Sequence, residues 1–140
     1  MATSFIHGDS RSGFYIPGEA RSIFSSDIDN DGHPDIICGH RLSAVTHWGG
    51  ISVMKNKGNG YYEPADSFLV ASGVGEVHCD LLDDNNLPDI FYCYTTSQPK
   101  ASYMGIIFNY QSSHFTDVES ISLVPNATVS HLACGDLDGF

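Results

Sequence analysis

Hydrophobic residues in this chain occur in short runs or alternate with polar residues, and Gly, Asn, Pro and Ser separate the runs. No window repeats apolar residues with the helical spacing i, i+3, i+4 and i+7, whereas alternation with a period of two is typical of strands. The pattern therefore predicts an all-β fold. The expected strands span residues 21–26, 35–39, 50–56, 67–71, 75–80, 89–94, 104–110 and 114–120.

Landmarks in the sequence recur at a spacing near 54 residues. Residues 27–36 (DIDNDGHPDI) return in weaker form as residues 81–90 (LLDDNNLPDI), 54 positions later. An asparagine and a cysteine recur after 53 and 55 positions, as Asn56 with Asn109 and Cys79 with Cys134. Four expected strands per period describe the blade of a β-propeller. The alternative is a single eight-stranded sandwich, which explains the strands but not the recurring acidic segment.

The spacing divides the chain into about two and a half blades. We expect a partial blade at 1–20, full blades at 21–74 and 75–128, and a partial blade at 129–140. Propellers close with about four to eight blades, so the chain is expected to be a fragment of a larger propeller. The alternative is that several copies of the chain associate to complete one ring.

Composition and charge narrow the possible partners. The chain has 140 residues, 41% of them hydrophobic, which is enough to build the core of one domain. Six Lys and Arg residues against seventeen Asp and Glu residues give a net charge of -11. This charge repels nucleic acids and anionic lipids, and no apolar run is long enough to span a bilayer. Nucleic-acid binding and membrane insertion are therefore not expected.

Residues 27–35 have the composition of a metal-binding loop. Carboxylates occupy positions 1, 3, 5 and 9, and Gly32 at position 6 permits the sharp turn that wraps a cation. Calcium binds about six to eight oxygen atoms, so it suits such a loop. An EF-hand is excluded because Cys38 takes position 12, where that loop needs Glu. The alternative is a solvated acidic turn. The candidate ligands are the side chains of Asp27, Asp29, Asp31 and Asp35 and the backbone carbonyl of His33.

Two further copies of this loop are weaker. In the second copy Leu81 takes position 1, and the aligned oxygen donors are Asp83, Asn85 and Asp89. The alternative for this copy is a turn held by Asn side-chain hydrogen bonds, with Asn86 at positive φ. In the third copy Asp136 and Asp138 match positions 1 and 3.

The acidic loop, the strand after it and the turn at 57–61 (KGNGY) together resemble the FG-GAP or VCBS-type repeats of integrin-alpha-like β-propellers. The resemblance implies a calcium ion in the hairpin between the first two strands of each competent blade. It implies adhesion, or binding of a protein or carbohydrate ligand, at an extracellular or cell-surface location, or an accessory role in a secreted enzyme.

The expected function is therefore a calcium-dependent, lectin-like or adhesive binding module in which calcium is structural. The alternative is a propeller domain of a secreted carbohydrate-active enzyme, a lyase, dehydratase or hydrolase. Its reactive groups would lie outside this chain or among His40, His47 and His114. The sequence contains no convergent set of acid, base and nucleophile, so we assign no catalytic residue.

Overall fold

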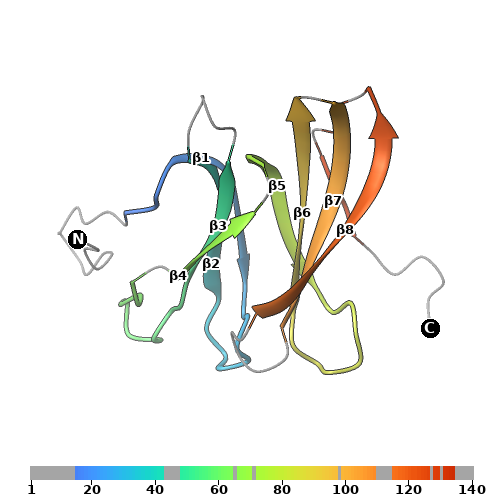
Figure 1. Ribbon diagram of the computed structural model, residues 1–140. Coiled ribbons are helices and arrows are strands. Elements are labelled where there is room, and N and C mark those ends of the chain that lie inside the picture. Colours follow the sequence, from blue (N-terminus) through green and yellow to red (C-terminus); the bar gives the residue numbers. More distant parts are fainter. Residues whose placement is uncertain are drawn as a thin grey trace.

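The structure is a computed structural model that describes residues 15–42, 48–64, 66–70, 72–97, 99–109, 115–126, 128–129 and 131–134. These residues form two antiparallel four-stranded sheets, and strand order within each sheet follows the chain (Figure 1). The first sheet contains β1 (Glu19–Ser26), β2 (Asp35–Arg41), β3 (Gly49–Met54) and β4 (Asp66–Val70). The second contains β5 (Val74–Asp80), β6 (Asp89–Ser97), β7 (Lys100–Asn109) and β8 (Phe115–Pro125). The all-β class and the eight expected strands are confirmed.

The described residues contain no helix that is long and apolar enough to cross a membrane. The hairpin of β6 and β7 is longer than the sequence predicts. Ser97 pairs with Lys100, and Thr95 pairs with Ser102, within a stretch that apolar alternation leaves as a loop. Small polar residues dominate this tip, and the hydroxyl oxygens of Thr95 and Ser102 lie 3.2 Å apart. Backbone pairing therefore extends the strands where no hydrophobic pattern marks them.

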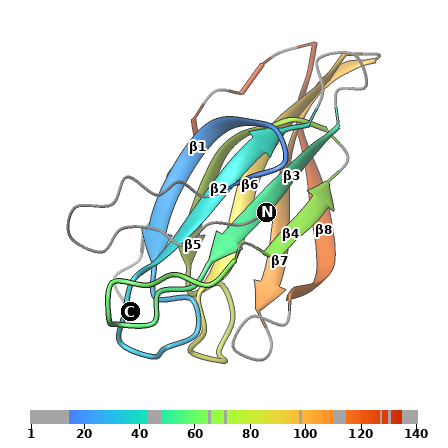
Figure 2. The same cartoon turned by 90° about the vertical axis from the view of Figure 1, so that its left-hand side faces the viewer.

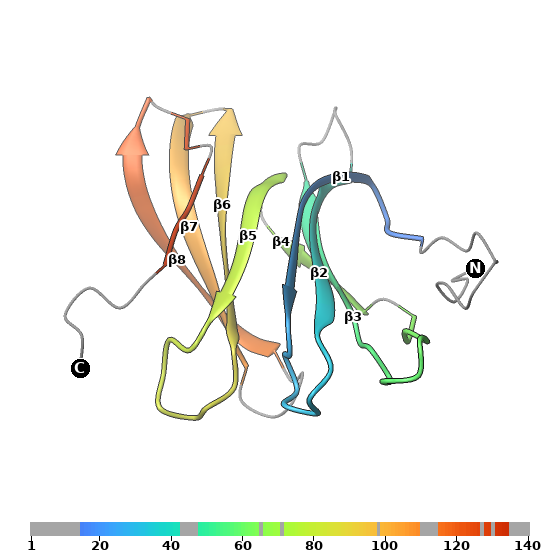
Figure 3. The ribbon, with the colours of Figure 1, turned by 180° about the vertical axis from the view of Figure 1, so that it is seen from behind.

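The two sheets pack face to face. Figures 1 and 3 show β1 and β5 side by side, and Figure 2 shows the sheets one behind the other. Removal of apolar side chains from water between the sheets is the main stabilising contribution. The shared core includes Ile28, Ile37, Ile51, Val53, Val74, Val77, Ile90 and Tyr92.

Several backbone features occur in both sheets at corresponding positions. The pairing of β1 with β2 has a bulge between Ala20 and Ser22, and the pairing of β5 with β6 has one between Val74 and Glu76. The N–H of Val77 donates to Ser22 Oγ at 3.1 Å, so β5 is bonded to the bulge of β1.

A matching contact follows the second sheet. The N–H of Leu132 donates to Glu76 Oε2 at 2.6 Å. Residues Ser22 and Glu76 are 54 positions apart, and Val77 and Leu132 are 55 positions apart. The segment 131–134 therefore contacts β5 as β5 contacts β1.

Candidate metal centre

The acidic loop at 27–34 joins β1 to β2, and its own hydrogen bonds shape it. The carboxylate of Asp27 accepts the N–H of Asp31 at 3.0 Å and the N–H of Gly32 at 2.9 Å. Asp31 Oδ1 in turn accepts the N–H of His33 at 2.9 Å. Gly32 has a φ of 89°, a left-handed conformation in which glycine has no steric penalty. Asp27 therefore holds the loop closed around its own carboxylate.

Asp35 begins β2 and is completely buried. Its Oδ2 accepts the N–H of Ile28 at 2.9 Å, and its Oδ1 accepts the N–H of Asn56 at 2.7 Å. Burial raises the pKa of this carboxyl, because desolvation outweighs the two hydrogen bonds that favour the charged form. Each carboxylate oxygen keeps a second lone pair, so these bonds leave Asp35 able to contact a cation.

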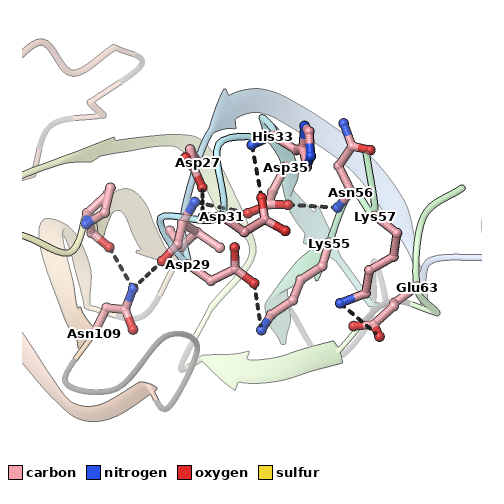
Figure 4. Close-up of polar contacts among 12 residues, drawn as sticks. Asp27, Asp29, Asp31, His33, Asp35, Lys55, Asn56, Lys57, Glu63 and Asn109 are labelled. Carbon is pink, nitrogen blue, oxygen red and sulfur yellow. Dashed lines mark hydrogen bonds and ion pairs between the residues drawn. The ribbon is translucent and has the colours of Figure 1, made fainter. Parts of the chain in front are cut away.

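Three carboxylates converge in this loop. Asp27, Asp29 and Asp35 each contribute an oxygen, and these oxygens lie within 4.8 Å of one another (Figure 4). Asp29 Oδ1 is buried and has no hydrogen-bond partner, and Asp29 Oδ2 lies 3.2 Å from Lys55 Nζ. A buried carboxylate oxygen without a partner is costly, and a cation would satisfy it. The donor set contains only oxygen, which suits a hard cation such as calcium.

The other two predicted ligands of this loop lie differently. The Asp31 carboxylate is bonded to the backbone of His33, and it is not one of the three that converge. The His33 ring packs against Gly58, where an added Cβ would lie only 2.2 Å from the ring Nε2. The side chains of Asp27, Asp29 and Asp35 are thus brought together, whereas ligation by Asp31 and by the His33 carbonyl stays a prediction.

Two residues after β3 complete the surroundings of the loop, and the sequence did not identify them as part of it. Lys55 contributes the ammonium group beside Asp29. Asn56 donates its N–H to Asp35, and its Nδ2 donates to the carbonyl of Pro34 at 3.1 Å. A signal for Asn56 was present, because this asparagine is one of the landmarks that recur along the chain.

The second loop, 81–88, repeats the anchoring of the first. Asp89 is completely buried, its Oδ2 accepts the N–H of Leu82 at 3.1 Å, and its Oδ1 accepts the N–H of Asn109 at 2.8 Å. The Nδ2 of Asn85 donates to Asp83 at 3.1 Å, and Asn86 has a φ of 60°. These are the features of a turn held by asparagine side chains.

Only the first loop shows convergence of at least three Asp, Glu, His or Cys ligand atoms within the part of the chain that the structure describes. Calcium binding by Asp83, Asn85 and Asp89 therefore stays a prediction. Asp136 and Asp138 of the third copy lie outside the described residues.

The two loops are bonded to each other. The Nδ2 of Asn30 donates to the carbonyl of Asn86 at 2.6 Å. The Nδ2 of Asn109, at the end of β7, donates to the carbonyl of Ile28 at 2.7 Å. The candidate metal loop is therefore fixed from one side by its own sheet and from the other by the neighbouring sheet.

His40 is the only described residue of the three histidines named for the enzymatic alternative, since His47 and His114 lie outside the described residues. It is completely buried, and its Nε2 lies 3.0 Å from Ser52 Oγ, which lies 2.7 Å from Ser67 Oγ. A group so enclosed has no access to a substrate. Burial lowers the pKa of His40 below its usual value.

We expect the buried neutral His40 to make the fold sensitive to acid. The unfolded chain binds a proton on this imidazole at a higher pH than the folded chain does. The contribution to stability is therefore complete above about pH 6.5 and falls by up to ~1.4 kcal/mol per pH unit below it. Urea unfolding of the wild type and of His40→Gln between pH 7.5 and 5 measures this effect. The variant should have the shallower pH dependence, and parallel curves would contradict the expectation.

No protein-family model matches this sequence, and no similar protein was found among curated proteins or among solved structures. The function must therefore be inferred from the chain's own geometry. The feature with the most specific chemistry is the carboxylate cluster of Asp27, Asp29 and Asp35.

Proposed function

We propose that this chain is a calcium-binding β-propeller module that binds a protein or carbohydrate ligand, with calcium in a structural role. The convergence of Asp27, Asp29 and Asp35 carries this proposal. The buried Asp29 Oδ1, which has no hydrogen-bond partner, adds a specific demand for a cation. Calcium is favoured over magnesium because it accepts irregular sets of oxygen ligands, whereas magnesium requires near-octahedral geometry.

Features that correspond across the two sheets support the propeller architecture. In a propeller each blade packs on the preceding blade in the same way. The bulges of β1 and β5 agree with this arrangement, and so do the carboxylates of Asp35 and Asp89, each of which accepts two backbone N–H groups. Ser22 accepts the N–H of Val77 in β5, and Glu76 accepts the N–H of Leu132 in the corresponding way. The two sheets are then successive blades, and further blades or other copies of the chain complete the ring.

Calcium in this proposal closes the β1–β2 loop onto Asp35, the first residue of β2. The ion binds the folded loop and not the unfolded chain, so it stabilises the fold by about 2.7 kcal/mol at a hundredfold excess over Kd. Calcium sites of extracellular modules commonly have Kd values of about 0.1 to 1 mM. We therefore propose an extracellular or cell-surface location, where millimolar calcium would keep the site loaded.

Calcium is expected to raise the melting temperature, and Asp29→Asn is expected to abolish the increase. Stabilisation of about 2.7 kcal/mol corresponds to a shift of roughly 5 to 10 °C for a domain of this size. Asp29→Asn keeps the shape of the side chain but removes its negative charge, so the side chain binds a cation more weakly. Melting curves with calcium and with a chelator measure both effects.

The matched control for this experiment is Asp83→Asn, at position 3 of the second loop. This variant should keep the full calcium response if the first loop holds the ion. A wild-type melting curve that does not change on chelation would refute the proposed calcium role.

A further inference from the structure

We propose that a cavity between the two sheets binds a small hydroxylated organic anion, with Arg21 and Arg41 holding its carboxylate. The cavity has a volume of about 460 Å³, and its lining includes Arg21, Arg41, Ser72, Tyr94 and Thr95. This volume lies within the range of about 300 to 1,000 Å³ that is usual for ligand pockets. The inference names a ligand class for the binding role proposed above and rests on that role, but it does not depend on calcium.

The cavity lies far along the strands from the candidate metal loop. Arg21 is near the start of β1 and Arg41 is the last residue of β2, whereas the acidic loop joins the opposite ends of these strands. In Figures 1 and 3 the loops at 27–34 and 81–88 lie at the lower end of the sheets, and β1 and β5 begin at the upper end. Ligand binding and calcium binding can therefore be tested separately.

The charge of the cavity is opposite to that of the chain. The whole chain has six Lys and Arg residues against seventeen Asp and Glu residues, yet two of its arginines line this one cavity. None of the described lining residues is Asp or Glu. Because the net charge repels extended polyanions, the cavity suits a small ligand with one anionic group rather than a nucleic acid.

The arginines already hold one carboxylate. Glu19 Oε2 lies 2.7 Å from the Nη2 of Arg41 and 3.3 Å from the Nη2 of Arg21. The hydrogen bond from Arg41 and the charge of Arg21 hold the pKa of Glu19 below its usual range. A guanidinium has five N–H donors, so both arginines have capacity for a second anion. Glu19 is expected to compete with a bound carboxylate for these donors.

The charged residues are not needed to build this part of the fold. The positions of Glu19, Arg21 and Arg41 recur 54 residues later as Gly73, Gly75 and Thr95. The second sheet nevertheless forms the same bulge in the strand that follows Gly73. The backbone of both sheets is therefore alike, and only the first sheet carries the charged side chains of Glu19, Arg21 and Arg41.

The small residues of the second sheet help to form the cavity. A Cβ added at Gly73 would lie 3.1 Å from Arg41 Cγ, so a side chain there would crowd the arginine. Gly75 and Val129, again 54 residues apart, also line the cavity. Three corresponding positions, Arg21, Gly75 and Val129, thus meet at one cavity, and only the first of them is charged.

Hydroxyl groups provide the second part of the expected recognition. Ser72 Oγ donates to the carbonyl of Thr95 at 3.1 Å, which leaves its lone pairs as acceptors. Thr95, Thr128 and Tyr94 also line the cavity, and Thr95 Oγ1 lies 3.2 Å from Ser102 Oγ. Hydroxyls beside a pair of guanidiniums match a ligand that has both alcohol groups and a carboxylate, which is the chemistry of a sugar acid.

Calorimetric titration with glucuronate tests the inference, with glucose and acetate as single-feature probes. Glucuronate should bind at least about tenfold more tightly than either probe, since glucose lacks the carboxylate and acetate lacks the hydroxyl groups. Arg21→Gln and Arg41→Gln should each weaken glucuronate binding by about tenfold or more, the effect of losing a hydrogen bond to a charged group. Glu19→Gln should strengthen binding, because the competing carboxylate is removed.

Lys100→Gln is the matched control, since Lys100 is an exposed cation that does not line the cavity. This variant should bind glucuronate as the wild type does. Arg21→Lys and Arg41→Lys keep the positive charge but lose the paired N–H donors of the guanidinium, so they should also bind glucuronate more weakly. Melting curves identify any variant that fails to fold. The inference is overturned by absence of glucuronate binding, by equal binding of acetate or glucose, or by arginine variants that bind normally.

Each titration is run with calcium and with a chelator. Glucuronate binding without any effect of calcium on melting would refute only the calcium role. Calcium stabilisation without glucuronate binding would refute only the anion site.

Discussion

Asp35→Ala is expected to destabilise the protein by about 2 to 6 kcal/mol even when calcium is absent. The Asp35 carboxylate is completely buried and accepts the N–H groups of Ile28 and Asn56. Its removal leaves two donors without an acceptor, and each buried donor left unpaired costs about 1 to 3 kcal/mol. Urea unfolding in the presence of a chelator measures the loss separately from any effect of the ion.

Two further variants serve as controls for the stability loss of Asp35→Ala. Asp89→Ala removes the corresponding clamp on Leu82 and Asn109, so it should cost a similar free energy and leave the calcium response intact. Asp31→Ala changes an exposed residue and should cost less than about 1 kcal/mol in the chelator. An Asp35→Ala variant as stable as Asp31→Ala under these conditions would show that the clamp does not stabilise the fold.

Asn109→Ala is expected to cost about 2 to 4 kcal/mol, because this side chain links the two sheets. Asn109 is completely buried, and its Nδ2 donates to the carbonyl of Ile28 at 2.7 Å and to that of Pro88 at 3.1 Å. The bond to Ile28 joins the end of β7 to the first acidic loop. The variant should therefore lose both local and inter-sheet stabilisation in a urea titration.

Asn56→Ala is the control for this second variant. Asn56 has the corresponding place in the first sheet, and its Nδ2 donates to Pro34 at 3.1 Å, with no bond to the other sheet among the described contacts. This variant should cost about 1 kcal/mol. Equal losses in the two variants would mean that the bond between Asn109 and Ile28 contributes nothing to stability.

The strands could be predicted because the hydrophobic residues of the sequence mark the positions that the fold buries. Residues 36–38 and 90–94 form short apolar runs that the fold buries almost throughout, and the strands β2 and β6 follow from these runs. The tip of the β6–β7 hairpin was missed because Thr95, Thr96 and Ser102 pair through the backbone without an apolar face. Hydrogen-bonded pairing of polar strands has no periodic signature in the sequence.

The candidate metal loop could be predicted in part, because its spacing is local. Asp27, Asp29 and Asp35 lie within nine residues, and the turn at Gly32 folds them toward one another. The approach of Lys55 to Asp29 could not be predicted, because it depends on how β3 leaves the sheet. The cavity at Arg21 and Arg41 likewise depends on two distant glycines, Gly73 and Gly75. In the sequence these glycines indicate only a break between two strands.

Calorimetric titration of the wild type, Asp29→Asn and Asp83→Asn with calcium tests the central claim most directly. We expect the wild type and Asp83→Asn to bind calcium at the first loop with the same affinity, and Asp29→Asn to lose that binding. A wild type that binds no calcium, or an Asp29→Asn variant that binds it as tightly as the wild type, would contradict the assignment of the ion to Asp27, Asp29 and Asp35.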